Sequence, residues 1–216
     1  MRRDERPPSQ PRDALGTLRR TVLTVALLNL GYFVVEFTVA LSAGSVSLLA
    51  DSVDFLEDTS INVLIALALG WPLARRALLG KVLAVVILGP AAVATWEAVQ
   101  RVAAPAAPRV APLVLASLGA IVVNGTSAVL LARIRTHGGS LGRAAFLSAR
   151  NDVVVNVAVI LMGVTTALTG SGWPDLVLGS VIIVLALHAA HEVWECSEDE
   201  RLAVALDSPV PGRPAP

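Results

Sequence analysis

Four carboxylic acids interrupt a long apolar stretch near residue 50, and they constrain the fold more than any other feature. The stretch, residues 45–62, reads SVSLLADSVDFLEDTSIN. If it is a helix, five of its polar side chains recur every three or four residues and share one face: Ser47, Asp51, Asp54, Asp58 and Asn62. Charged groups are costly in hydrocarbon. On a membrane-spanning helix this face must therefore turn into a bundle, where buried acids usually mark an ion or proton path.

The rest of the composition supports a membrane protein. Of 216 residues, 55% are hydrophobic and only 16% are charged, whereas a soluble domain carries roughly 25% charged residues. The apolar residues form long runs, which predicts an integral protein of the lipid bilayer. A net charge of zero and 4% aromatic residues argue against a nucleic-acid partner. The one cysteine, Cys196, excludes an internal disulfide and a multi-cysteine metal cage.

We expect an all-α integral membrane fold with six transmembrane helices, because six runs approach the length that crosses about 30 Å of hydrocarbon. The expected spans are residues 21–44, 45–71, 82–99, 111–134, 144–169 and 175–194. Gly89-Pro90 predicts a kink in the third span. The expected organisation is a disordered basic arm (1–17), a transmembrane domain (18–195) and a short cytosolic tail (196–216).

Basic residues predict the orientation. They crowd the N-terminal arm, the loop at 72–81 and the segment with Arg133, Arg135, Arg143 and Arg150. The opposite loops carry only Arg101 and Arg109. The positive-inside rule then places both termini in the cytoplasm, and this bias in a compact chain suggests a bacterial inner membrane. Four tryptophans near span ends are typical of interfacial anchors: Trp71, Trp96, Trp173 and Trp194.

Asp54 and Asp58 lie four residues apart and can chelate a divalent cation or share protons. In the fifth span, Asp152 adds a third carboxylate, and Ser148 and Asn156 add neutral oxygens on the same face. A ligand set without imidazole or thiolate favours manganese, iron or cobalt, although zinc also accepts carboxylates. Two alternatives remain open. An acid can be protonated and hydrogen-bonded to a neighbouring helix, and the serine and asparagine can serve helix packing.

Other polar residues have less defined roles. Asp51 either belongs to the ion path or, as we favour, accepts hydrogen bonds that hold the loop before the second span. Asn29 and Glu36 share a helical face and could shuttle protons or brace the bundle. His188 and His191 could hold a surface metal, but a pair of this kind is more often an interfacial feature.

These motifs resemble the cation diffusion facilitator family of divalent-metal efflux transporters. The similar segments are NLGYFVVEF in the first span, SVSLLADSVDFLED in the second, and NDVVVNV in the fifth, followed by WPD. The six-span order and the cytoplasmic termini are similar too. The resemblance covers about residues 18–195.

The resemblance implies a transport site made of two pairs of ligands. A His or Asp and an Asp four apart in the second span correspond to Asp54 and Asp58. In the fifth span, Asp152 matches the second member of a His and Asp pair, whereas Ser148 departs from the first. Asn156 or a water would complete the site. The resemblance also implies a homodimer and exchange of metal for protons, with no prosthetic group. The family's C-terminal metal-sensing domain and His-rich loop have no counterpart here, so we expect a short form with any dimer held in the membrane.

The predicted function is efflux of a divalent cation by alternating access, not enzymatic catalysis. Zinc is the favoured ion, with cobalt, cadmium, manganese or iron as alternatives. One rival is a non-transporting membrane metal sensor or subunit, since the site departs from the family pattern. A remote rival is an intramembrane aspartyl protease, but its family carries a GxGD motif, and Ala-Arg-Asn precedes Asp152 here.

Overall fold

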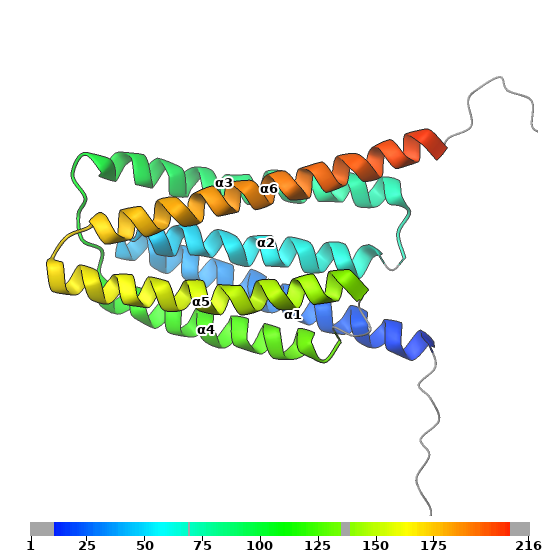
Figure 1. Cartoon of the computed structure of the whole chain (residues 1–216), viewed down its shortest axis with the longest axis horizontal. Coiled ribbons are helices and arrows are strands. Elements are labelled where there is room, and N and C mark those ends of the chain that lie inside the picture. Colours follow the sequence, from blue (N-terminus) through cyan, green and yellow to red (C-terminus); the bar gives the residue numbers. More distant parts are fainter. Residues whose placement is uncertain (1–10, 69, 135–138, 208–216) are drawn as a thin grey trace, which may run out of the picture.

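The computed structural model describes residues 11–68, 70–134 and 139–207. Six helices follow one another: α1 (Pro11–Ala43), α2 (Val46–Ala68), α3 (Leu73–Val102), α4 (Val110–Ala132), α5 (Gly139–Thr169) and α6 (Trp173–Asp207). They run lengthwise and alternate in direction, and no strand occurs in the described residues (Figure 1). We call the end where α1 begins and α6 finishes the terminal end. The opposite end, with the α1–α2, α3–α4 and α5–α6 connections, is the turn end. The all-α expectation is confirmed.

Five of the described helices, α1, α3, α4, α5 and α6, are long and apolar enough to cross a membrane. Helix α2 has 23 residues, a length of about 35 Å at 1.5 Å per residue. It is not counted with these five because a spanning helix needs a long stretch with few charged residues. The acids of α2 lie so close together that every stretch of 18 residues in this helix contains all four of them. The predicted count of six spans therefore depends on α2 alone.

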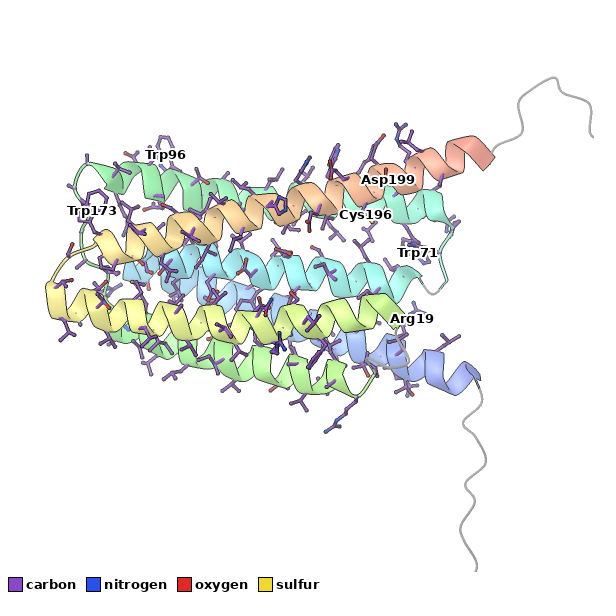
Figure 2. All side chains as sticks on the ribbon, viewed as in Figure 1. Arg19, Trp71, Trp96, Trp173, Cys196 and Asp199 are labelled. Atoms are coloured by element: carbon purple, nitrogen blue, oxygen red, sulfur yellow. The ribbon has the colours of Figure 1, made fainter. Side chains whose placement is uncertain are left out.

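The outward faces of the bundle are apolar. Large hydrophobic side chains are strongly exposed on α1, α4 and α5, for example Leu27, Leu115 and Leu168, which is 83% exposed. Trp96 and Trp173 lie at the turn end and Trp71 at the terminal end (Figure 2), as expected of anchors at two membrane interfaces. Such a surface suits lipid better than water.

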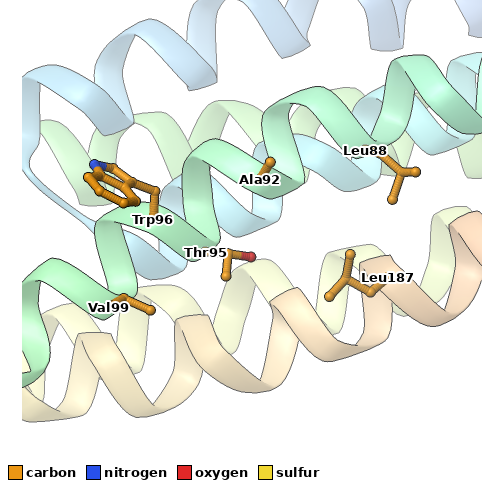
Figure 3. A pocket seen from close by; sticks show the side chains of 6 residues that line it. All are labelled: Leu88, Ala92, Thr95, Trp96, Val99 and Leu187. Atoms are coloured by element: carbon orange, nitrogen blue, oxygen red, sulfur yellow. The ribbon is translucent and has the colours of Figure 1, made fainter.

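A shallow pocket between α3 and α6 belongs to this apolar surface (Figure 3). Its lining is Leu88, Ala92, Thr95, Trp96, Val99 and Leu187. The Thr95 hydroxyl donates to Ala91 O of its own helix at 2.8 Å. Apart from this bonded hydroxyl and the indole ring of Trp96, the lining is aliphatic, as on the rest of the apolar surface.

Several helices extend beyond the predicted boundaries. Helix α1 begins at Pro11, inside the arm expected to be disordered, because proline fits the first turn of a helix. Residues 1–10 of that arm and 208–216 of the tail lie outside the described part. Helix α3 starts at Leu73 and continues through Pro90. Helix α6 runs to Asp207, since no proline follows Pro174 and no glycine follows Gly179 within it. Hydropathy marks where a helix leaves the apolar layer, not where it ends.

Helix α2 lies at the centre of the bundle. It packs against α1, α3, α5 and α6, while α4 packs on α1 and α5, and α3 packs on α6. Towards the turn end, Leu48 and Leu49 of α2 join a cluster with residues of α4, α5 and α6, including Leu113, Val159 and Leu176. Other helices therefore surround α2 over most of its length, including the segment that carries its acids.

The turn between α1 and α2 is held by its neighbours. Gly44 has a φ of +71°, a left-handed conformation that glycine adopts without strain, and its N–H donates to Ala40 O at 2.9 Å. Arg101 of α3 donates to Gly44 O. Arg109, just before α4, donates through its side chain to Ser42 O and through its backbone N–H to Ala43 O. Both basic groups at the turn end thus bind backbone carbonyls.

Asp175, in the first turn of α6, caps the start of α2 across the bundle. Its Oδ2 accepts from Val46 N at 2.8 Å, and its Oδ1 accepts from Ser47 N at 3.1 Å. The hydroxyls of Ser45 and Ser47 each donate to Oδ1 at 2.7 Å. One turn further along α6, a Cβ added to Gly179 would lie 2.7 Å from Ser47 N. The carboxylate thus satisfies α2's free N–H groups from another helix, and glycine permits the close approach.

We predict that Asp175→Asn lowers the free energy of unfolding by on the order of 2 kcal/mol, because an amide cannot accept all four hydrogen bonds. Thermal unfolding of the detergent-solubilised protein measures the loss. Asp199→Asn, on the exposed side of the same helix, is the matched control and should leave the midpoint unchanged. Equal midpoints for the two variants would contradict this account of the cap.

Candidate cation site

The polar face of α2 lies inside the bundle. Ser47, Asp51 and Asn62 are at most 1% exposed and Asp58 is 5% exposed. Asp54, in the middle of the same face, is partly exposed. Helices α1 and α5 contact this face at Asp58, and α6 contacts it at Ser47. These side chains therefore lie on one face of α2, as predicted.

Asp58 joins three helices through its carboxylate. Its Oδ2 accepts from Asn29 Nδ2 of α1 at 3.2 Å, and its Oδ1 accepts from Ser148 Oγ of α5 at 3.0 Å. On the next turn of α2, Asn62 Nδ2 donates to the backbone carbonyl of Asp58 at 2.8 Å. Neutral donors on both sides stabilise this buried carboxylate without a basic partner.

Asp152 lies one helical turn after Ser148, and its carboxyl group lies close enough to that of Asp58 to interact directly. Two carboxylates so close in apolar surroundings cannot both remain ionised at low cost. A shared proton or a bound cation neutralises them. Asp54, one turn from Asp58, interacts electrostatically with both. The charge on each of the three acids therefore affects the other two.

Asn156 completes the α5 side of the group. It is fully buried, and its Nδ2 donates to Asp152 O at 2.8 Å. Its Oδ1 is buried, and none of the described groups donates a hydrogen bond to it. An amide oxygen can only accept, so it requires a water, a donor or a cation. An oxygen ligand for a divalent ion is thus available beside Asp152.

The structure brings some predicted ligands together more closely than others. Asp58, Ser148 and Asp152 are in contact, whereas Asp54 and Asn156 flank them. In the described part of the chain, no three Asp, Glu, His or Cys side chains converge closely enough to hold a metal ion as they stand. Coordination here would therefore use the serine and asparagine oxygens or a rotation of Asp54.

Sequence reasoning did not assign Asn29 to the site, although its spacing from Glu36 marked a shared polar face. The structure shows Asn29 donating directly to Asp58. A further polar stripe on α4 was also missed. Its residues are buried and have unpartnered side-chain oxygens: Ser117, Asn124 and Ser127. Their spacing of seven and three residues was the available signal.

The favoured role of Asp51 is wrong. The loop before α2 is held by Asp175, and neither carboxyl oxygen of Asp51 has a donor in the described part of the chain. His188 and His191 lie on an exposed face of α6. Each contacts a glutamate four residues further along, Glu192 at 3.3 Å and Glu195 at 3.2 Å. Their interfacial role stays a prediction.

Comparison with known proteins gives two distant relatives, both named "Cadmium, cobalt and zinc/H(+)-K(+) antiporter". The protein from Bacillus subtilis (strain 168) is 26% identical over 200 residues, which cover 84% of this chain and 63% of the relative. The protein from Bacillus velezensis is 24% identical over 201 residues, covering 84% and 62%. The chain thus spans less than two thirds of the length of these relatives. No family model matches it. The apolar helices and this similarity support an integral membrane protein.

We predict that Ser148→Ala weakens zinc binding about tenfold, since loss of a hydrogen bond to a metal ligand typically has such an effect. Competition with a zinc-sensitive dye at constant pH measures the affinity of the solubilised protein. Ser180→Ala is the control, because among the described residues the Ser180 hydroxyl bonds only to Leu176 O of its own helix. Unchanged affinity in Ser148→Ala would exclude this serine from the site.

Proposed function

We propose that the protein exports a divalent metal cation in exchange for protons. The observation that carries the proposal is the Asp58 carboxylate, held by neutral donors from α1 and α5 and facing Asp152 in the centre of an apolar bundle. A buried group of acids without a basic partner requires a cation to neutralise it. A transporter uses that requirement, because the metal and the protons compete for the same oxygens.

In the proposed mechanism, Asp54, Asp58 and Asp152 bind the cation, while Ser148 and Asn156 supply neutral oxygens. Metal entry displaces protons, because the carboxyl ligands must be deprotonated. After the helices rearrange to expose the site on the other side, protons displace the metal. The connections between helices are short, so rocking of helix groups is the motion we propose.

Zinc is the favoured cargo. The names of both relatives include zinc, cobalt and cadmium, and zinc accepts carboxylate ligands as well as softer ones. Manganese and iron remain alternatives because all five predicted ligands are oxygen donors. The names of the relatives also include potassium, so potassium is a second candidate for the counter-ion.

We further propose six spans with α2 as the second, and both termini in the cytoplasm of a bacterial inner membrane. Basic residues gather towards the terminal end: Arg19, Arg20, Arg75, Arg76, Lys81 and Arg133. Arg135 and the side chain of Arg143 lie outside the described part of the chain. A homodimer within the membrane follows only from the family resemblance. Placing the termini by protease protection of inverted and right-side-out vesicles tests this orientation.

We predict that Asp54→Asn and Asp152→Asn each abolish metal flux, since each removes a charged ligand. Sealed proteoliposomes with a metal dye and a pH dye inside measure both fluxes after zinc, cobalt, cadmium, manganese or iron is added. Asp199→Asn, which changes an exposed acid on α6, should transport normally. Normal flux in both site variants would refute the proposal.

The same assay separates the rival functions. Zinc binding without flux of any of the metals would favour a membrane sensor or subunit. Cleavage of a helical peptide by the solubilised protein, lost in Asp58→Asn, would favour an intramembrane aspartyl protease. Either result would replace transport as the function of these acids.

A further inference from the structure

A second pair of acids lies about one helical turn from Asp54, towards the turn end. Glu36 of α1 and Asp51 of α2 are both fully buried, and their carboxyl groups lie close enough to interact directly. None of their four oxygens has a donor among the described groups. Without a proton, both side chains are acceptors only, so no hydrogen bond can form between them.

The register of α1 and α2 separates this pair from Asp58. The two helices are antiparallel, and the Asn29–Asp58 hydrogen bond joins them. Glu36 lies seven residues after Asn29, and Asp51 lies seven residues before Asp58. Both are thus displaced towards the turn end by about 10 Å, two helical turns. The spacing explains why they meet, and it places them on the outward side in the proposed orientation.

The surroundings of the pair supply no positive charge from the groups identified there. On α1, Tyr32 donates its hydroxyl to Ala116 O. On α2 and α5, Asp54 and Asp152 add negative charge. Elsewhere at the turn end, Arg101 of α3 and Arg109, just before α4, bind carbonyls of the α1–α2 turn, and Asp175 of α6 caps α2. Therefore only a bound cation, which can be a proton or a metal ion, can neutralise Glu36 and Asp51.

We infer that Glu36 and Asp51 form a proton-binding site distinct from the metal site, and that its proton is released when a divalent cation binds near Asp58. A proton needs only the two carboxyl oxygens that face each other. A metal ion would need further ligands, and no third Asp, Glu, His or Cys side chain converges on the pair in the described residues. With its proton the pair carries one negative charge; after release it carries two. A divalent cation about 10 Å away stabilises the doubly charged form.

The coupling to metal rests on the proposed function, whereas the shared proton does not. Infrared spectroscopy of the full chain in lipid, at neutral pH and without metal, tests the proton directly. The carbonyl band of protonated carboxyl groups should lose a component in Glu36→Gln and in Asp51→Asn. It should be unchanged in Glu192→Gln, an exposed glutamate on α6. A full band in both pair variants would overturn the inference.

A double variant that exchanges the two acids controls for misfolding of the single variants. The double variant Glu36→Asp with Asp51→Glu keeps two carboxyl groups at the same place and should restore the missing component. Adding zinc at constant pH should remove that component from the wild-type spectrum. Restoration without any response to zinc would overturn the coupling and leave only a structural proton.

Flux measurements then connect the pair to exchange. In proteoliposomes, Glu36→Gln should still carry zinc but move fewer protons per zinc ion than Glu192→Gln. An unchanged ratio would overturn the inference while leaving zinc transport established. No zinc flux in the wild type would instead overturn the proposed function, and the infrared result would still stand. Zinc flux that requires potassium, with the requirement lost in Glu36→Gln, would assign the pair to potassium and overturn the proton site.

Discussion

Carboxylates cannot face hydrocarbon, and this constraint explains the position of α2. Its four acids exclude it from the lipid-facing layer, and the other helices, which are apolar on their outer sides, surround it. Alanines and serines on α2, such as Ala50 and Ser52, are fully buried at the contacts with its neighbours, and small residues allow helices to approach closely in membranes. The acidic helix is thus the core of the bundle rather than an addition to it.

The buried acids are arranged at two levels along the axis. At one level Asp58 receives hydrogen bonds from an amide and a hydroxyl, so neutral donors stabilise its charge. At the other level Glu36 and Asp51 receive no hydrogen bond from the residues that the structure describes. Carboxyl side chains thus occupy two electrostatic settings in this bundle. One suits the ionised carboxylate, and the other suits the protonated carboxylic acid. This difference is a property of the neighbouring helices, not of the acids.

The periodicity of α2 was sufficient to predict its polar face, and the apolar runs predicted the number and order of the helices. The fifth-span spacing also brought Ser148 and Asp152 to the correct side of α5. Contacts between distant segments were not predictable in this way. Asp175 lies 129 residues from Val46 along the chain, and nothing in either segment alone indicates that one caps the other. Helix ends were misplaced for a different reason: α6 continues as a helix into a polar segment, where hydropathy carries no signal.

The cap formed by Asp175 has a mechanical consequence for α2. Four hydrogen bonds and a close glycine contact fasten the helix to α6 at the turn end. Any tilt of α2 that preserves these bonds must pivot there. Displacement in such a tilt grows with distance from the pivot, so Asp58 moves farther than Asp51, and Ala68 moves farthest. Helix α2 then behaves as a lever, in which a small change of angle at the capped end becomes a wide opening at the opposite end.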